Sequence, residues 1–458
     1  MIIPAYPAYK NSGVQWLGEV PEHWAVRRFK QIFNERAERS KDGSEDLLSV
    51  SAYYGVKRRA ETLDDGDHLT RAESLEGYKI CYSGDLVINI MLAWNRGLGF
   101  AWMDGIVSPA YCVFHIYDDS DPKYLDYLVR SNEMTRYFKA YSTGVIDSRL
   151  RMYPETFGRL YVATPQSEEQ TQIARFLDHE TARIDTLIQE QQRLIELLKE
   201  KRQAVISHAV TKGLDPTVPM KDSGVEWLGE VPEHWVVCAS RRAIRFIEQG
   251  WSPECESYPA DEDAWGVLKA GCVNRGVFDS SENKTLPSTL KPIPEYEVRA
   301  GDILMSRASG SPELVGSTAL LGQVRERLML SDKIFRVHLE EMISRRFFVW
   351  VMNAQFMRSQ IEQALSGGNG LANNLPQSSL LAFWLAVPPD HEQDAISDLV
   401  NKQTGRIDEL ITESEVTSAF LQERRSALIS AAVTGKIDVR GWQPPAEALS
   451  PKEVLESV

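Results

Sequence analysis

The sequence predicts an α+β fold in which two mixed α/β domains, related by a pseudo-two-fold internal duplication, are separated by a long antiparallel two-helix coiled coil. The first observation behind this prediction is a repeated phrase. Residues 11–24 read NSGVQWLGEVPEHW and residues 222–235 read DSGVEWLGEVPEHW, which match at twelve of fourteen positions with an offset of 211. A period of this length is too long for a solenoid repeat and indicates a duplicated domain.

The second observation is another matched pair of segments. EQTQIARFLDHETARIDTLI, from Glu169, matches EQDAISDLVNKQTGRIDELI, from Glu392, with an offset of 223, and the register continues without a gap to AVTKGLD at 209–215 and AVTGKID at 432–438. Since the offset rises from 211 to 223, the middle of the second copy is twelve residues longer. Matching ends with diverging middles indicate one task performed twice on two different targets.

The middles have β character. Short apolar runs bounded by Gly, Pro and Asp are typical of strands and turns. The sequence G-D-L-V at 84–87 returns as G-D-I-L at 301–304, and each middle continues with a helical patch (124–140 and 345–365) before an exit strand. We therefore expect both middles to be variants of one mixed fold.

From residue 167 the apolar residues recur every seven positions, which predicts a heptad seam on a long helix in each copy. A two-fold relation between tandem copies makes these two helices antiparallel, and about 40 helical residues at ~1.5 Å each give a rod of roughly 60 Å. The polar pair Gln191 and Ser414 is expected to fix the register. The predicted seam consists of Leu177, Ile184, Leu187, Gln191, Leu194 and Leu198 in the first copy, and Val400, Ile407, Leu410, Ser414 and Leu421 in the second.

Composition places the chain among ordinary globular proteins. Its 458 residues suffice for two or three domains, 43% of them are hydrophobic, and no stretch resembles a membrane span or a signal peptide, so we expect a cytoplasmic protein. Five scattered cysteines without a CxxC pair argue against a disulfide scaffold or a zinc site. The net charge of -14 argues against indiscriminate coating of nucleic acid, although local basic clusters remain.

Signatures of catalysis are missing. No Gly-rich loop ends in GK[ST], no Asn/Asp-Pro-Pro-aromatic tetrad of an adenine or cytosine methyltransferase occurs, and Glu282-Asn283-Lys284 lacks the preceding strand Asp of a metal-dependent nuclease. His23 and His234, at equivalent places in the repeated phrase, are expected to be buried and bonded to local backbone. We therefore predict no catalytic residue and no metal site.

Several segments together resemble a family. The phrase DSGVEWLGEVPEHW, Leu304-Met305-Ser306-Arg307, V-G-S-T at 315–318 and an exit strand with Pro388-Pro389 leading into Glu392-Gln393 are similar to the specificity subunits of type I restriction-modification systems. The resemblance covers about residues 10–440 and is carried by the combination of motifs. Copy one departs at Ala163-Thr164-Pro165-Gln166, which lacks the double proline.

The resemblance implies a non-catalytic subunit of a phage-defence complex. Two target-recognition domains would each read one half of a bipartite, asymmetric site in double-stranded DNA, and the long helices would dock two methyltransferase subunits and, through them, restriction/translocase subunits. S-adenosylmethionine is expected in the methyltransferase, and no cofactor in this chain. The alternatives are a coiled-coil scaffold without DNA readout and a single-chain restriction nuclease. The implied boundaries are 1–165 (first recognition domain), 166–212 (helix), 213–388 (second recognition domain), 389–440 (helix) and 441–458 (tail).

Candidate contact residues follow from this division of labour, in which Lys and Arg hold phosphates and polar side chains read base edges. Arg96 and Arg307 are chosen because they follow the two G-D strands, where loops on a rigid scaffold carry function. Exposed positions beside Ile184 and Ile407 are candidates for partner docking. The DNA-binding candidates are Lys57, Arg58, Arg59, Arg96, Arg149 and Arg151, with Lys269, Asn274, Arg275, Arg307 and Asn373; the docking candidates are Arg183, Asp185, Arg406 and Asp408.

Overall fold

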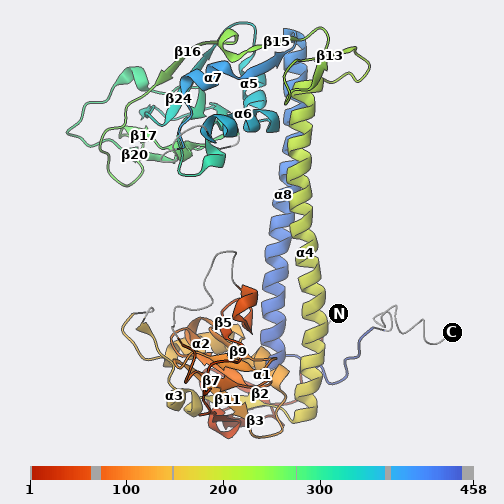
Figure 1. The fold of residues 1–458 in the computed structure, drawn as a ribbon. Helices are drawn as coiled ribbons and strands as arrows, with labels where there is room; N and C mark the ends of the chain where they lie inside the picture. The colour runs from red at the N-terminus through yellow and green to blue at the C-terminus, as the bar shows by residue number, and fades with distance from the viewer. Residues whose placement is uncertain (1–2, 63–73, 147–148, 275, 367–372, 446–458) are drawn as a thin grey trace, which may run out of the picture. The chain divides into compact units, whose positions relative to one another are not determined.

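The computed structural model describes residues 3–62, 74–146, 149–274, 276–366 and 373–445. The chain divides into two compact units (Figure 1). Unit 1 comprises residues 1–191 and 416–458, and unit 2 comprises residues 192–415. Each unit thus contains one repeated phrase, one divergent middle, and part of each long helix.

The repeated phrase forms the same local structure in both units. In unit 1 it lies in the hairpin of β1 (Tyr9–Asn11) and β2 (Glu19–Pro21), and in unit 2 in the hairpin of β13 (Met220–Asp222) and β14 (Glu230–Pro232). The next strands, β3 (Ala25–Arg28) and β15 (Val236–Ala239), pair antiparallel with the exit strands β12 (Tyr161–Thr164) and β25 (Trp384–Val387). Each unit is therefore closed by pairing its entrance strand with its exit strand.

Both middles are built on the same four-stranded antiparallel sheet. The strand order is β4-β11-β8-β9 in unit 1 and β16-β24-β21-β22 in unit 2. The strands are β4 (Phe33–Glu35), β8 (Leu86–Asn89), β9 (Leu98–Phe100), β11 (Tyr111–Ile116), β16 (Ile244–Gln249), β21 (Ile303–Ser306), β22 (Thr318–Leu320) and β24 (Ile334–Leu339).

The recurring G-D motif makes the turn that leads into an inner strand of each sheet, β8 in unit 1 and β21 in unit 2. Gly84 and Gly301 have φ values of +91° and +88°, a region that L residues rarely adopt. The following carboxylates, Asp85 and Asp302, each accept a 2.9 Å hydrogen bond from the backbone N–H three residues earlier. The motif is thus a structural turn signal, because glycine permits the backbone conformation and the aspartate closes the turn.

The middles diverge in what is added to the sheet. Unit 1 adds the hairpin β5 (Leu48–Ser51)–β6 (Gly55–Arg58) and the pair β7 (Lys79–Cys81)–β10 (Gly105–Val107). Unit 2 instead adds the three-stranded sheet β20-β17-β23, whose β17 (Gly266–Leu268) pairs parallel with β23 (Leu328–Met329) and antiparallel with β20 (Asn283–Thr285). A common scaffold therefore carries different attachments.

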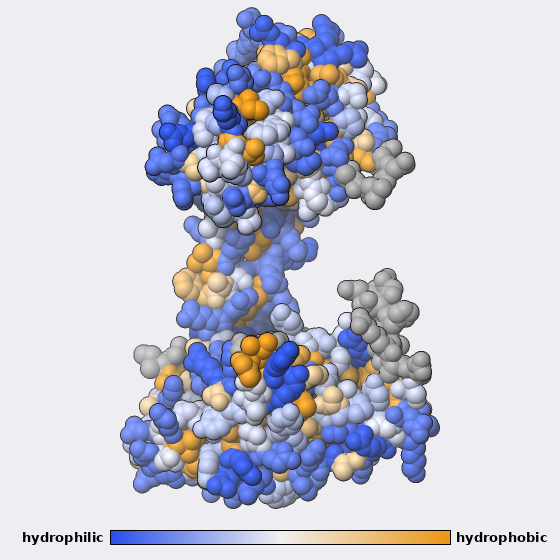
Figure 2. Space-filling model, turned by 90° about the vertical axis from the view of Figure 1, so that its left-hand side faces the viewer, coloured by the Kyte–Doolittle hydropathy of each residue, from blue (hydrophilic) through white to orange (hydrophobic). Residues whose placement is uncertain are grey.

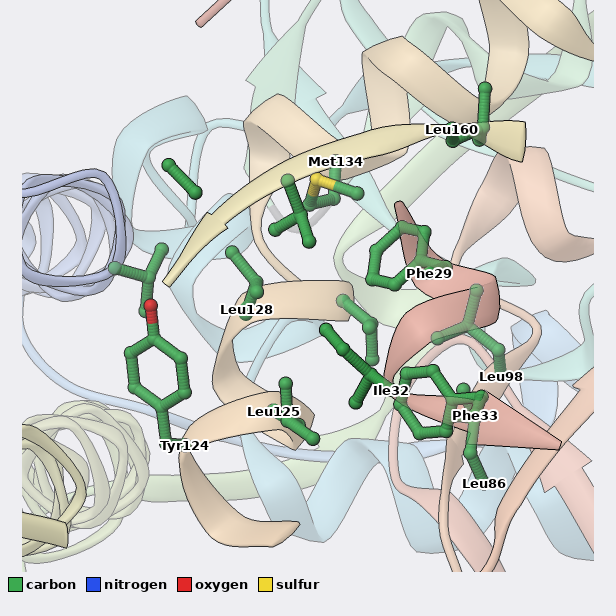
Figure 3. Packing of buried hydrophobic residues seen from close by; sticks show 14 of the residues in the cluster. Phe29, Ile32, Phe33, Leu86, Leu98, Tyr124, Leu125, Leu128, Met134 and Leu160 are labelled. Carbon is green, nitrogen blue, oxygen red and sulfur yellow. The ribbon is translucent and has the colours of Figure 1, made fainter. Parts of the chain in front are cut away.

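Helices cover one side of each sheet. They are α1 (Pro122–Val129), α2 (Asn132–Tyr141) and α3 (Pro154–Arg159) in unit 1, and α5 (Arg345–Met352), α6 (Gln355–Ser366) and α7 (Gln377–Ala382) in unit 2. Phe29, Ile32 and Phe33 point toward Leu125 and Leu128 of α1 (Figure 3) and are buried, which joins the sheet, the entrance segment and the helices in one core.

The long helices are α4 (Ser167–Lys212) and α8 (Asp390–Val433). Each is followed by a glycine with φ of +74°, Gly213 after α4 and Gly435 after α8, although the two glycines lie one position out of register in the repeat. In unit 1 the start of α4 shares a core with the end of α8, and in unit 2 the end of α4 shares a core with the start of α8. The two helices therefore pack antiparallel within each unit.

The seam between the helices differs in part from the prediction. Leu177, Ile184, Leu198, Val400, Ile407 and Ser414 are buried, and Gln191 and Leu421 are half-buried, whereas Leu187, Leu194 and Leu410 are exposed. The second row of seam residues lies four positions, and not the predicted three, after each residue of the heptad row that begins at Leu177 or Val400. These residues are Thr181, Ile188 and Ile195 on α4, and Thr404, Ile411 and Ser418 on α8. One residue rotates a side chain by ~100° around a helix, so the predicted interleaved leucines face outward.

The repeated histidines are also placed differently from the prediction. His23 and His234 are each 41% exposed, and their Nε2 atoms lie 2.7 and 2.6 Å from Glu169 and Glu392. They pair with matched carboxylates on the long helices because the phrase is folded against the first turn of each helix.

Candidate nucleic-acid interface

Two of the candidate cations in unit 1, Lys57 and Arg58, lie on the hairpin β5–β6, and a third, Arg59, begins the short helix η2 (Arg59–Thr62) directly after it. Lys57 is exposed and its Nζ lies 5.5 Å from the centroid of the Tyr54 ring, while Arg59 is half-buried. Arg58 donates a 2.8 Å hydrogen bond to Asp46 and lies 3.6 Å from Glu61. Since two carboxylates already neutralise Arg58, Lys57 is the better placed of the two cations for a phosphate.

Arg130, at the end of α1, holds this hairpin in place. Its Nη1 donates to the Leu98 carbonyl at 2.7 Å, and its Nη2 lies 3.3 Å from the carbonyl oxygens of both Ala52 and Tyr53. The guanidinium is largely buried, and this desolvation lowers its pKa. One carbonyl of β9 and two of the turn between β5 and β6 are thus tied to one cation, which fixes the hairpin tip on the sheet.

The approach of Arg130 requires a glycine on the hairpin. A Cβ at Gly55, where φ is +76°, would lie 2.7 Å from Nη1. The clamped tip presents Tyr53 with 94% of its surface exposed. No local sequence pattern points to Arg130, because its partners are backbone carbonyls about 30 and 80 residues away.

Arg96 borders a hollow of about 520 Å³ in unit 1. It follows the short helix η3 (Ala93–Asn95) with φ at +59°, a region that non-glycine residues seldom occupy, and its guanidinium donates to the Asn132 side chain. Tyr53, Trp102 and Arg130 line the same hollow, and Trp102 is exposed. Aromatic faces next to guanidinium groups are the combination that stacks bases and holds backbone phosphates.

Arg149 and Arg151 lie in the loop after α2. Arg149 is exposed, whereas Arg151 is half-buried and exchanges two 2.9 Å backbone hydrogen bonds with Thr143. The structure brings these two arginines together on one loop, but it does not place them in the hollow beside Arg96.

The candidates of unit 2 fall into two groups. Arg307 donates to the Asp332 carbonyl at 2.9 Å and lies 5.7 Å from the Phe335 ring centroid, and Asn373 lies on the neighbouring segment, its carbonyl 3.3 Å from the Ser309 N–H. Lys269 is 3.5 Å from Glu282, and Asn274 is exposed on β18 (Val273–Asn274). Arg275 lies outside the described residues.

Two of the four helix candidates link the helices. Asp185 on α4 binds Arg425 on α8 within unit 1, and Asp408 on α8 binds Arg202 on α4 within unit 2, each at 2.8 Å. Arg183 is exposed and lies 3.1 Å from Glu180 on its own helix, and Arg406 is exposed. The carboxylates are therefore engaged inside the chain, while the two arginines point outward.

Within the described ranges, no three His, Cys, Asp or Glu side chains come together as potential metal ligands. Nor does any helix of these ranges combine the length and the apolar character that crossing a membrane requires.

Comparison with solved structures identifies the class of fold. A chain from the structure titled "Structural basis underlying complex assembly and conformational transition of the type I R-M system" matches 91% of this chain and 99% of its own length with a TM-score of 0.68 at 15% identity. The HsdS subunit from Thermoanaerobacter tengcongensis matches 91% of this chain and 98% of its own length, with a TM-score of 0.51 at 15% identity. The fold is therefore shared with HsdS subunits.

Sequence comparison points the same way. The chain is 34% identical over 198 residues to the type I restriction enzyme EcoEI specificity subunit of Escherichia coli, a match that covers 43% of this chain and only 33% of that protein. It is 23% identical over 445 residues to the putative type I restriction enzyme MjaX specificity subunit of Methanocaldococcus jannaschii, covering 93% and 96% of the two chains. No family model matches the sequence. In sequence and in fold, the chain is similar to type I restriction enzyme specificity subunits, which confirms the resemblance inferred from its motifs.

Proposed function

We propose that this chain is a non-catalytic DNA-specificity subunit in which each unit reads one half of a bipartite, asymmetric target. The observation that carries the proposal is the shared sheet with different attachments: the strand order is the same in both units, while the added elements differ. A protein that must recognise two unlike half-sites needs such a scaffold, because the scaffold sets position and the variable parts set the sequence read.

In unit 1 the reading surface would be the hairpin β5–β6 and the hollow beside it. Lys57 supplies a cation for a phosphate, and Arg96 with Trp102 supplies polar and stacking contacts. In unit 2 the surface would include Arg307 and Asn373, which lie on neighbouring segments. Since the whole chain carries a net charge of -14, binding would depend on such local cations and weaken steeply with salt.

The long helices would dock two copies of a methyltransferase subunit, which would bind S-adenosylmethionine and recruit the restriction subunits. Matched exposed apolar side chains support this: Leu187 of α4 corresponds to Leu410 of α8, and Leu197 of α4 corresponds to Phe420 of α8. Unit 1 carries Leu187 and Phe420, and unit 2 carries Leu410 and Leu197, so each unit holds an equivalent pair. Hydrophobic residues reach the surface of the long helices (Figure 2). Equivalent apolar surfaces suit identical partners.

The test is to express the chain with a methyltransferase subunit and to sequence the methylated positions in genomic DNA. A two-part motif with a fixed unread spacer supports the proposal. Two results contradict it. In one, the chain and the methyltransferase subunit together methylate DNA without sequence preference; in the other, they methylate only a continuous motif. If the chain binds DNA but supports no methylation by the partner, the long helices serve as a structural scaffold and not as the docking surface proposed here.

A further inference from the structure

The carboxylates at the start of the two long helices have different surroundings. Glu169 Oε1 accepts hydrogen bonds from the Tyr6 hydroxyl at 2.6 Å and from the Trp24 indole N–H at 3.0 Å. Glu392 Oε2 accepts the matching indole bond, from Trp235 at 3.0 Å, but no hydroxyl reaches it among the residues that the structure describes. The Glu169 side chain is 9% exposed and that of Glu392 is 29% exposed.

A pocket occupies the place in unit 2 that Tyr6 fills in unit 1. The Tyr6 ring lies 5.5 Å from the His23 ring and its hydroxyl bonds Glu169, and the residues of unit 2 that match His23, Glu169 and Pro21 of β2 are His234, Glu392 and Pro232. These three residues line a cavity of about 250 Å³ together with Leu214, Val218, Ala395 and Ile396.

Chain connectivity explains the pocket. In unit 1 two separate segments, residues 3–8 and 436–442, contribute to this region, since one leads into β1 and the other follows α8. In unit 2 the single connection 213–219 matches both segments, since it must lead from α4 directly to β13. The counterpart of Tyr6 is Thr217, whose hydroxyl donates to Asp215 at 2.6 Å. Seven residues cannot supply the side chains of two segments.

A neighbouring apolar position is uncovered for the same reason. In unit 1 Trp442 packs on Phe176, with ring centroids 5.3 Å apart, and Phe176 is 1% exposed. The matching residue in unit 2, Leu399, is 37% exposed. The uncovered surface therefore extends from the pocket along α8 to Leu399. A polypeptide segment that places one side chain in the pocket would need such an adjoining surface.

We propose that this pocket receives a tyrosine side chain from a segment of a partner protein, with its hydroxyl donating a hydrogen bond to Glu392 and its ring lying against His234. The contacts of Tyr6 in unit 1 show that this phrase and this carboxylate accommodate a phenol. The indole-bound oxygen of Glu392 retains an acceptor position, and a hydroxyl bonded to a charged group is a strong contact. The proposal does not depend on DNA recognition.

The test uses the full chain with isotope-labelled methyl groups and titrates N-acetyltyrosinamide as the probe, with N-acetylphenylalaninamide as the matched control that lacks the hydroxyl. We expect shifts confined to the methyl signals of Leu214, Val218 and Ile396, and roughly tenfold tighter binding of the tyrosine probe. The variant Ala395→Trp, at an exposed position of the pocket wall, should abolish these shifts while leaving the other methyl signals unchanged.

Three results would overturn the proposal. They are methyl signals that stay unshifted up to the solubility limit of the probe, equal binding of the two probes, and binding of the probe by Ala395→Trp as tight as by the natural chain. Each outcome is independent of whether the chain reads DNA.

Discussion

Asp185 on α4 accepts two hydrogen bonds from Arg425 on α8, from Nε at 2.8 Å and from Nη2 at 3.1 Å. The same contact occurs once in each unit, because Asp408 and Arg202 are related to these residues by the offset of 223 and bind each other at 2.8 Å. The duplication therefore preserved a contact between the helices as well as the helices themselves, and a paired carboxylate–guanidinium contact specifies which registers of the two helices can form.

The ion pair should contribute modestly to stability. Asp185 is about half-exposed, so a double-mutant cycle of Asp185→Ala and Arg425→Ala should give a coupling of about 0.5–1 kcal/mol in the free energy of unfolding. Urea denaturation of the four chains provides the measurement. Arg183→Ala, which removes a pair within one helix, is the control and should show no coupling to Arg425→Ala; strictly additive effects of Asp185→Ala and Arg425→Ala would refute the assignment.

The glycines that follow the two long helices allow a second comparison. Gly435→Ala should destabilise the chain more than Gly213→Ala. Both substitutions place a side chain at φ near +74°, which costs about 1 kcal/mol, but a Cβ at Gly435 would lie 2.4 Å from Pro21 Cδ, whereas one at Gly213 would lie 3.2 Å from the Trp235 ring. Thermal denaturation of both variants checks the order, and an equal loss would show that the contact with Pro21 relaxes freely.

Arg130→Ala should loosen the hairpin β5–β6 without unfolding the sheet, because the hydrogen bonds to Leu98, Ala52 and Tyr53 are lost. Limited proteolysis should then cut near Tyr53 faster than it does in the natural chain. With a methyltransferase partner, we expect weaker recognition of one half-site only. Arg345→Ala, which removes a single exposed contact to the Gly301 carbonyl in unit 2, is the matched control and should leave cleavage at Tyr53 unchanged.

Docking on the helices can be tested one unit at a time. Leu187→Asp with Phe420→Asp should remove one methyltransferase copy and leave a complex with one, and Leu410→Asp with Leu197→Asp should do the same for the other copy. Native mass measurement gives the stoichiometry. A complex that keeps two copies in both double variants would exclude these surfaces, and the same experiment on Arg183→Glu tests the charged alternative.

Much of the scaffold could be predicted from the sequence, because a duplicated chain shows which segments are held constant. The G-D turns and the long helices depend on local chemistry, glycine conformation and apolar periodicity, that a single sequence displays. The sequence could not show which residues complete the seam, since spacings of three and of four residues both fit a heptad. Leu187, predicted from the spacing of three, is exposed.

The contacts that shape the candidate site were less accessible to sequence reasoning. Arg130 acts through backbone carbonyls that only the folded hairpin brings together. The pocket at Glu392 arises from a missing side chain, which becomes visible only when the two units are compared in space. The roles of Lys57 and Arg307 in DNA binding stay predictions.

The central claim is that two independent readers share one scaffold, and one exchange tests it most directly. Residues 26–165 are replaced by the corresponding middle of a related specificity subunit, the hybrid is expressed with the methyltransferase partner, and the methylated sites are sequenced. The account predicts a motif in which one half-site has changed while the other half-site and the spacer length are preserved. A change in both half-sites, or in neither, would contradict it.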